Sequence, residues 1–221
     1  MTQRVLVTSA VPGRPARDSD EVHQQAGRLL ARLHVAERPQ PYPQFADASQ
    51  ERMEALLRRA AGLLDARESD FVRSQVLSMS TLPSPRAVPC HLDYSTRNWL
   101  VDSDGALRVI DFAGARRDVW VFDLRRLEFG AWATQPGLRE AFFDGYGRLP
   151  SPEDEALLRA SGALTAVSRI VRGTERNLPK ATADGRLILA RSMHGRTFGA
   201  RTTAKLAKKW RATARARCGD S

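Results

Sequence analysis

The stretch HLDYSTRNWLVDSDGALRVIDF, residues 91–112, decides the fold of this 221-residue chain. It places aspartates, an asparagine and a histidine between short apolar runs. The dipeptide Asp104-Gly105 favours a two-residue turn, because both central positions of such a turn require positive φ. We therefore expect a β-hairpin with Asp104 and Gly105 at its tip.

The pairing of this hairpin follows by counting outward from the turn. Leu100 would face Val109, and Asn98 would face Asp111, with opposed residues about 5 Å apart. Asp93 precedes them on a loop that can fold back over the same place. An amide oxygen and a carboxylate suit a hard divalent cation, and a second carboxylate can accept a proton from a hydroxyl. The alternative for Asn98 and Asp111 alone is structural, since both residue types are common at strand ends.

The order of these residues resembles a known site. His-x-Asp, an Asn, a hairpin and then Asp-Phe is the order found in the phosphoryl-transfer site of protein kinases. It is more similar to the aminoglycoside phosphotransferase family, which includes choline-kinase-like enzymes and usually shows His-Gly-Asp and Ile-Asp-Phe. This chain has HLD, with Leu92 in place of the usual Gly, and IDF. LLARLH at 29–34 resembles the family's linker helix, and VWVFDLRRL at 119–127 resembles its later Asp-Leu segment.

The resemblance implies an α+β, mostly helical fold: the C-terminal lobe of a protein-kinase-like fold with a small catalytic β-hairpin. It implies a phosphotransferase that uses Mg²⁺ and ATP, or another nucleoside triphosphate, to phosphorylate a hydroxyl of a small molecule. Asp93 would be the catalytic base, and Asn98 and Asp111 would hold Mg²⁺. His91 and Asp123 would support the site structurally; a general-base role is the alternative for His91.

The resemblance also sets the expected domain organisation. Residues 1–18 would be a hinge strand, RVLVT at 4–8, and a loop from the junction with an N-terminal lobe. Residues 19–221 would be the helical C-terminal lobe, with its catalytic and metal loops at 91–112 and a basic helix at about 184–215. The family's glycine-rich phosphate loop and strand lysine find no counterpart, so no further cofactor-binding residue is predicted. The alternative function is therefore a catalytically inactive C-lobe that acts as a binding module. A homodimer or a complementing N-lobe would be its protein partner.

Hydrophobic periodicity predicts the remaining elements. We expect helices near 19–34, 49–66, 68–80, 121–133, 137–147 and 152–178, and a strand near 87–90. Asp18 with Glu21 resembles a capping box, and Ser151 before Pro152 is typical of a helix start. His23, His34 and His194 are interpreted as packing or surface residues.

The net charge of +10 is unevenly distributed. Residues 182–221 carry ten Lys and Arg against two aspartates, and the rest of the chain is close to neutral. The basic tail could meet lipid or nucleic acid, but a terminal helix with solvated charges is the simpler interpretation. Glu153, Asp154 and Glu155 are explained by the dipole of the helix they begin. The charge distribution is therefore as compatible with a neutral or anionic metabolite as the acceptor as it is with a cationic antibiotic. For an antibiotic acceptor, the function would be antibiotic resistance.

Two distant cysteines, Cys90 and Cys218, form no disulfide or metal pattern. No apolar run approaches the about 20 residues of a membrane span, and the N-terminus lacks the pattern of a signal peptide. We expect a cytoplasmic protein with reduced thiols, a small-molecule hydroxyl substrate, and neither membrane nor nucleic acid as a partner.

Overall fold

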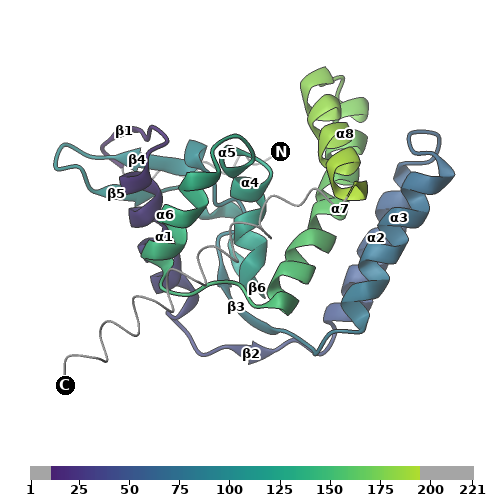
Figure 1. Ribbon diagram of the computed structural model, residues 1–221, viewed down its shortest axis with the longest axis horizontal. Coiled ribbons are helices and arrows are strands. Elements are labelled where there is room, and N and C mark those ends of the chain that lie inside the picture. The colour runs from purple at the N-terminus through teal and green to yellow at the C-terminus, as the bar shows by residue number, and fades with distance from the viewer. Residues whose placement is uncertain (1–10, 195–221) are drawn as a thin grey trace, which may run out of the picture.

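The computed structural model describes residues 11–194 of the chain. Its short strands all lie in the first 119 residues, mixed with helices and 3₁₀ segments, and only helices follow from Arg125 to Met193 (Figure 1). In chain order the elements are β1 Arg14–Pro15, α1 Asp20–His34, β2 Gln40–Pro41, α2 Phe45–Arg59, α3 Ala66–Ser80, β3 Arg86–Cys90, η1 Thr96–Asn98, β4 Trp99–Val101, β5 Leu107–Val109, η2 Phe112–Gly114, β6 Arg116–Val119, η3 Trp120–Leu124, α4 Arg125–Glu128, α5 Ala131–Thr134, α6 Pro136–Tyr146, α7 Pro152–Glu175 and α8 Pro179–Met193.

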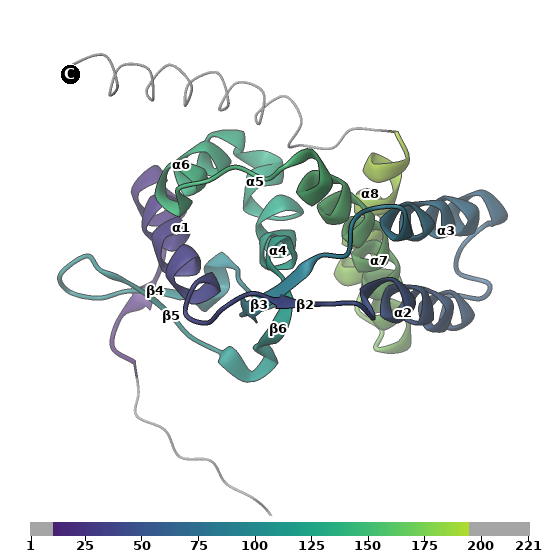
Figure 2. The same ribbon diagram turned by 90° about the horizontal axis from the view of Figure 1, so that it is seen from below.

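The helices form two groups on either side of a small sheet. Helices α1 and α6 lie beside the β4–β5 hairpin, while α2, α3, α7 and α8 pack together on the other side (Figures 1 and 2). Strands β2, β3 and β6 form an antiparallel sheet between the groups, and β1, β4 and β5 form a second one. Each helical group has its own cluster of buried apolar side chains. The fold is thus α+β and mostly helical, as expected.

The close contact of α1 with α6 depends on glycine. A Cβ atom at Gly27 would collide with the Phe142 carbonyl, and one at Gly145 would collide with the Gln24 carbonyl. Small residues at a crossing allow two helix backbones to approach each other. This contact fixes α1, whose last residue reaches the site described below.

Two predicted helix starts can be compared with the structure. Ser151 and Asp154 form the capping box of α7, behind Pro152 at the first helical position. The predicted Asp18–Glu21 box is wrong: Ser19 is the N-cap of α1, and its hydroxyl accepts from the Val22 amide. Asp18 bonds His23 instead, with 3.2 Å between its Oδ1 and Nε2.

Several helix boundaries also differ from the prediction. The helix expected at 121–133 is divided into η3, which leads directly into α4, and α5, which is separated from α4 by a break at its N-cap Gly130. Helix α2 begins earlier than expected, at Phe45, and α3 begins after the Asp65 capping box. Helix α8 begins at Pro179, and the remainder of the predicted basic helix, like the strand at 4–8, lies outside the described residues.

The hairpin forms, but the predicted register is wrong by one residue. Leu100 pairs with Arg108 rather than with Val109. The carboxylate of Asp102 accepts from the amides of Asp104 at 3.0 Å and Ala106 at 2.9 Å, which closes a three-residue loop. Gly105 has a φ of 79°, as the αL position of such a loop requires.

Among residues 11–194, no helix combines the length and the apolar character that crossing a membrane requires.

Candidate functional site

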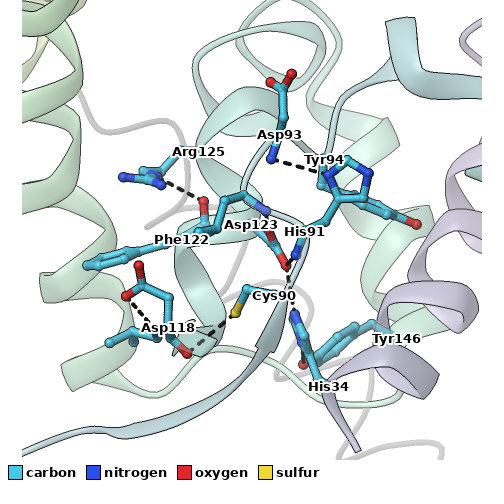
Figure 3. A network of polar contacts seen from close by, with 12 residues as sticks. His34, Cys90, His91, Asp93, Tyr94, Asp118, Phe122, Asp123, Arg125 and Tyr146 are labelled. Carbon is cyan, nitrogen blue, oxygen red and sulfur yellow. Dashed lines mark hydrogen bonds and ion pairs between the residues drawn. The ribbon is translucent and has the colours of Figure 1, made fainter. Parts of the chain in front are cut away.

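The loop of residues 91–98, which we call the catalytic loop after the role predicted for Asp93, is anchored at its start by a buried carboxylate. Asp123 comes from η3 and is fully buried. Its Oδ2 accepts the His91 amide at 2.9 Å (Figure 3). Its Oδ1 accepts the Leu92 amide. A carboxylate that receives two backbone amides fixes the direction of the chain there, because each lost bond would leave a buried donor unsatisfied.

A buried histidine, interpreted from the sequence as a packing or surface residue, also bonds the Asp123 carboxylate. His34, the last residue of α1, places its Nε2 3.0 Å from Asp123 Oδ2 and its Nδ1 2.7 Å from the Tyr146 hydroxyl. Both partners are distant in sequence, so periodicity could not reveal them. The resemblance of LLARLH to a family segment was the one signal that marked this histidine.

His91 connects the catalytic loop to residues 110–114, which we call the metal loop after the role predicted for Asp111. Its Nε2 lies 2.9 Å from the Ile110 carbonyl, and its Nδ1 lies 3.3 Å from the Asp93 amide nitrogen. A carbonyl can only accept and an amide N–H can only donate, so these partners assign the proton to Nε2. In this arrangement His91 has a positioning role, since both ring nitrogens are engaged with the backbone.

Leu92 has a φ of 63°, in the left-handed region. This conformation costs a residue with a side chain about 1–2 kcal/mol relative to glycine. It is the position at which the similar family usually has glycine. The leucine side chain is partly buried and packs against the apolar cluster of the α1–α6 side.

Asp93 stands on this loop between two arginines. Its Oδ2 bonds Arg97, and its Oδ1 lies 3.0 Å from Arg126 Nε without the geometry of a hydrogen bond. Burial alone would raise the pKa of Asp93, but the Arg97 hydrogen bond, the charges of both arginines and a bond from Asn98 lower it below its ordinary value. The carboxylate is therefore ionised at neutral pH and can accept a proton.

Asn98 turns its amide group toward the same carboxylate. Its Nδ2 donates to the Asp93 carbonyl at 2.9 Å and approaches Oδ2 at 3.4 Å. The side chain is buried, and its oxygen lies on the opposite side of the amide group. Opposite Asn98 stands Ile110, whose amide donates to the Asn98 carbonyl at 3.0 Å.

Asp111 does not pair directly with Asn98, which corrects the predicted register. It lies one residue beyond Ile110, after the end of β5, and is exposed, with φ of 64°. Within the described part of the chain its carboxylate makes no hydrogen bond or ion pair. Oxygen ligands of this kind, a carboxylate and an amide oxygen, fit Mg²⁺ better than a softer metal.

A second group of metal-binding residue types, His34, Cys90 and Asp123, lies within 4.8 Å in the core. Its polar atoms are already engaged, because Asp123 bonds His34 and the Cys90 thiol bonds the Asp118 carbonyl at 3.4 Å. Burial and the charges of Asp123 and Asp118 raise the pKa of the Cys90 thiol, so it stays protonated. We interpret this group as structural.

An apolar hollow lies beside the hairpin. Its volume is about 400 Å³. Phe112, directly after Asp111, is one of its walls and is 49% exposed. The other residues that line it are Val11, Leu29, Leu33, Tyr94, Leu107, Arg108 and Val109.

The fold and the arrangement of the two loops are those of a kinase-like phosphotransferase. The model of the phosphotransferase enzyme family matches residues 2–160, and the chain belongs to this family. No curated protein matches the sequence.

Solved structures show the same fold at low sequence identity. A spectinomycin phosphotransferase in complex with AMP is 16% identical over 83% of this chain and 66% of that chain, with a TM-score of 0.56. The GDP and kanamycin complex of APH(2")-IIia is 17% identical over 84% of this chain and 69% of that one, with a TM-score of 0.64. An aminoglycoside phosphotransferase from Alicyclobacillus acidocaldarius is 19% identical over 90% of this chain and 70% of that one, with a TM-score of 0.56. The chain thus spans about two thirds of the length of these structures.

Proposed function

We propose that this protein transfers the terminal phosphoryl group of a nucleoside triphosphate to a hydroxyl of a small molecule. The observation that carries this proposal is the placement of Asp93. It is an ionised carboxylate on a rigid loop, tied through His91 to the loop that carries Asp111. Phosphoryl transfer depends mostly on positioning and charge, so a rigid loop of this kind is what the reaction needs.

In the proposed mechanism, Asp93 orients the acceptor hydroxyl and takes its proton. Oδ1 is the atom suited to this role once Arg126 moves aside, since it has no hydrogen bond but is buried beside that guanidinium. Asn98 and Asp111 would hold Mg²⁺, which supplies charge neutralisation at the phosphates when bound. His91 and Asp123 hold Asp93 in place without meeting the substrate.

The apolar hollow beside the hairpin would take the base of the nucleotide. Its apolar wall and its position next to the metal loop suit a flat base with its phosphates directed toward Asp111. Three solved structures of this fold carry AMP, ADP or GDP, which supports a nucleotide as the donor.

The test is Mg²⁺-dependent release or transfer of phosphate from ATP and GTP by the 221-residue chain. Asp93→Asn should lower the rate by about 10²–10⁴-fold, the usual contribution of a general base. Asp104→Asn, an exposed aspartate of the hairpin turn, is the matched control and should leave the rate unchanged. Equal rates for the two variants would refute the role of Asp93.

The second candidate is a binding module that holds nucleotide without turnover. It is favoured by one observation, that Asp93 Oδ1 is buried beside Arg126, where an acceptor hydroxyl does not reach it. In this case residues 19–221 would act as the kinase-like C-lobe, paired with a second copy or with an N-lobe. Saturable nucleotide binding with no phosphate release in any variant would select this function.

A further inference from the structure

A cavity lined by arginines lies beside the catalytic loop, and none of its lining residues belongs to the β4–β5 hairpin. Its volume is about 230 Å³, and Leu92 of the catalytic loop forms part of its wall. Two hydroxyl residues of α7, Thr165 and Ser168, also line it. The remaining lining residues, from α2, β6, α4 and α7, are Arg52, Arg116, Arg125, Arg126, Arg169 and Arg172.

No acidic side chain among the described residues lines this arginine cavity. Arg116 pairs with Asp118, and Arg126 pairs with Asp93. The other four arginines form no ion pair within residues 11–194, although the charge of Asp184 reaches Arg169, and those of Asp118 and Asp123 reach Arg125.

The positive charges in the cavity oppose one another. Burial first, and then the charge of Arg52, lowers the pKa of Arg125 to about 10. Burial and neighbouring arginines also lower the pKa of Arg169. Like charges held together at partial burial destabilise the folded chain unless an anion offsets them. Their arrangement around one cavity therefore favours the binding of an anion there.

We propose that the arginine cavity binds the acceptor through an anionic group, so that the substrate is a small hydroxyl compound carrying a phosphate or a carboxylate. This inference rests on the proposed function and names the substrate class of that site. Guanidinium groups bind both anions through paired hydrogen bonds. The cavity is also smaller than the about 300–1,000 Å³ typical of sites for drug-sized ligands, which suits a compact anion.

The position of Arg126 connects anion binding to catalysis. It lines the cavity and lies 3.0 Å from Asp93 Oδ1. An anion in the cavity competes with Asp93 for this guanidinium. Its arrival therefore releases Oδ1 to receive the hydroxyl of the same molecule, and a neutral acceptor lacks this effect.

An acidic hollow on α2 is the place where a cationic acceptor would be expected instead. It is lined by Asp47, Glu51 and Glu54, together with Gln50 and Arg58. It shares no residue with the catalytic loop or the arginine cavity. The charge next to Asp93 is therefore the opposite of what a polycation requires.

The test uses four probes that share a pyranose ring but differ in charge: glucose 6-phosphate, glucuronate, glucose and glucosamine. Titration calorimetry of the full chain should show the two anions binding, with glucose 6-phosphate at least about tenfold tighter than glucose or glucosamine. Arg169→Gln should weaken the glucose 6-phosphate affinity by about tenfold. Arg73→Gln, an exposed arginine of α3 paired with Asp70, removes the same charge outside the cavity and should change nothing.

Three results would overturn the inference. Glucose or glucosamine could bind as tightly as glucose 6-phosphate, or kanamycin could bind in preference to every anion. Alternatively, ATP in the presence of EDTA could displace glucose 6-phosphate, which would assign the cavity to the donor's phosphates. The ratio of the affinities for glucose 6-phosphate and glucuronate identifies whether phosphate or carboxylate is preferred.

Different results would refute the proposed function and this inference. Asp111→Asn should weaken binding of Mg²⁺-ATP and leave glucose 6-phosphate binding intact. Anion binding by a chain that never releases phosphate from ATP would refute the proposed function and keep the anion site. Phosphate transfer that shows no preference for anionic acceptors would refute the substrate class alone.

Discussion

The catalytic loop and the metal loop meet at one site but are held in different ways. The catalytic loop is fixed by buried side chains: Asp123 receives two of its amides, and His91 is fully buried beneath it. In the metal loop, residues 111–114 are exposed, and Asp111 makes no hydrogen bond or ion pair within the described residues. A proton acceptor must be positioned before the reaction, whereas a metal ligand can be ordered by the metal itself. The difference thus predicts that mutations in the two loops affect different properties.

The largest loss of stability is expected when Asp123, the anchor of the catalytic loop, is replaced. Asp123→Ala leaves the His91 and Leu92 amides and the His34 ring without their acceptor. The free energy of unfolding should fall by about 3–5 kcal/mol, as is typical when one partner of a buried charged network is removed. Urea unfolding measures it, with Asp104→Ala as the control. A loss below about 1 kcal/mol would contradict the anchor, because such a loss is normal for a surface residue.

A smaller change in stability is expected from Asp93, and it appears at acidic pH. Its pKa in the folded chain lies below the ordinary value, despite burial, because of Arg97 and Arg126. Its stabilisation is therefore present above the pKa of the unfolded state and is lost as the pH falls through the lower, folded-state pKa. Between pH 7 and pH 3, the wild type should lose more stability than Asp93→Asn. Parallel stability curves for the two proteins would show that the arginines do not hold this carboxylate.

The smallest effect on stability is expected in the metal loop. Asp111 adopts a φ of 64°, which glycine tolerates freely. Asp111→Gly should change the free energy of unfolding by less than about 1 kcal/mol, since relief of the left-handed conformation offsets the added freedom of the unfolded chain. Thermal unfolding checks this. A loss as large as that of Asp123→Ala would mean that Asp111 has a structural role and that the two loops are not different in kind.

The parts of the fold that could be predicted from the sequence are those encoded locally. Helix α7 follows from its cap and apolar spacing, and the order of Asp93, Asn98 and Asp111 identified the candidate site. The hairpin register could not be predicted from Asp104-Gly105 alone, because the Asp102 side chain selects a longer loop.

The long-range parts of the site were not predictable in the same way. His34 joins Asp123 and Tyr146 across 89 and 112 residues. The arginine cavity assembles side chains from four separate elements, and none of them stands out in a chain with 35 Lys and Arg. Only the packing of α2, α4, β6 and α7 brings these charges together.

The measurement that tests the central claim most directly is calorimetric titration of the full chain with Mg²⁺-ATP and Mg²⁺-GTP, beside Asp111→Asn and Asp104→Asn. The account predicts saturable, Mg²⁺-dependent binding that Asp111→Asn weakens by at least about tenfold, the effect of losing a charged ligand interaction. Asp104→Asn should bind like the wild type. Nucleotide binding that is equal in all three proteins, or absent from a well-folded wild type, would contradict a phosphotransferase site built from these two loops.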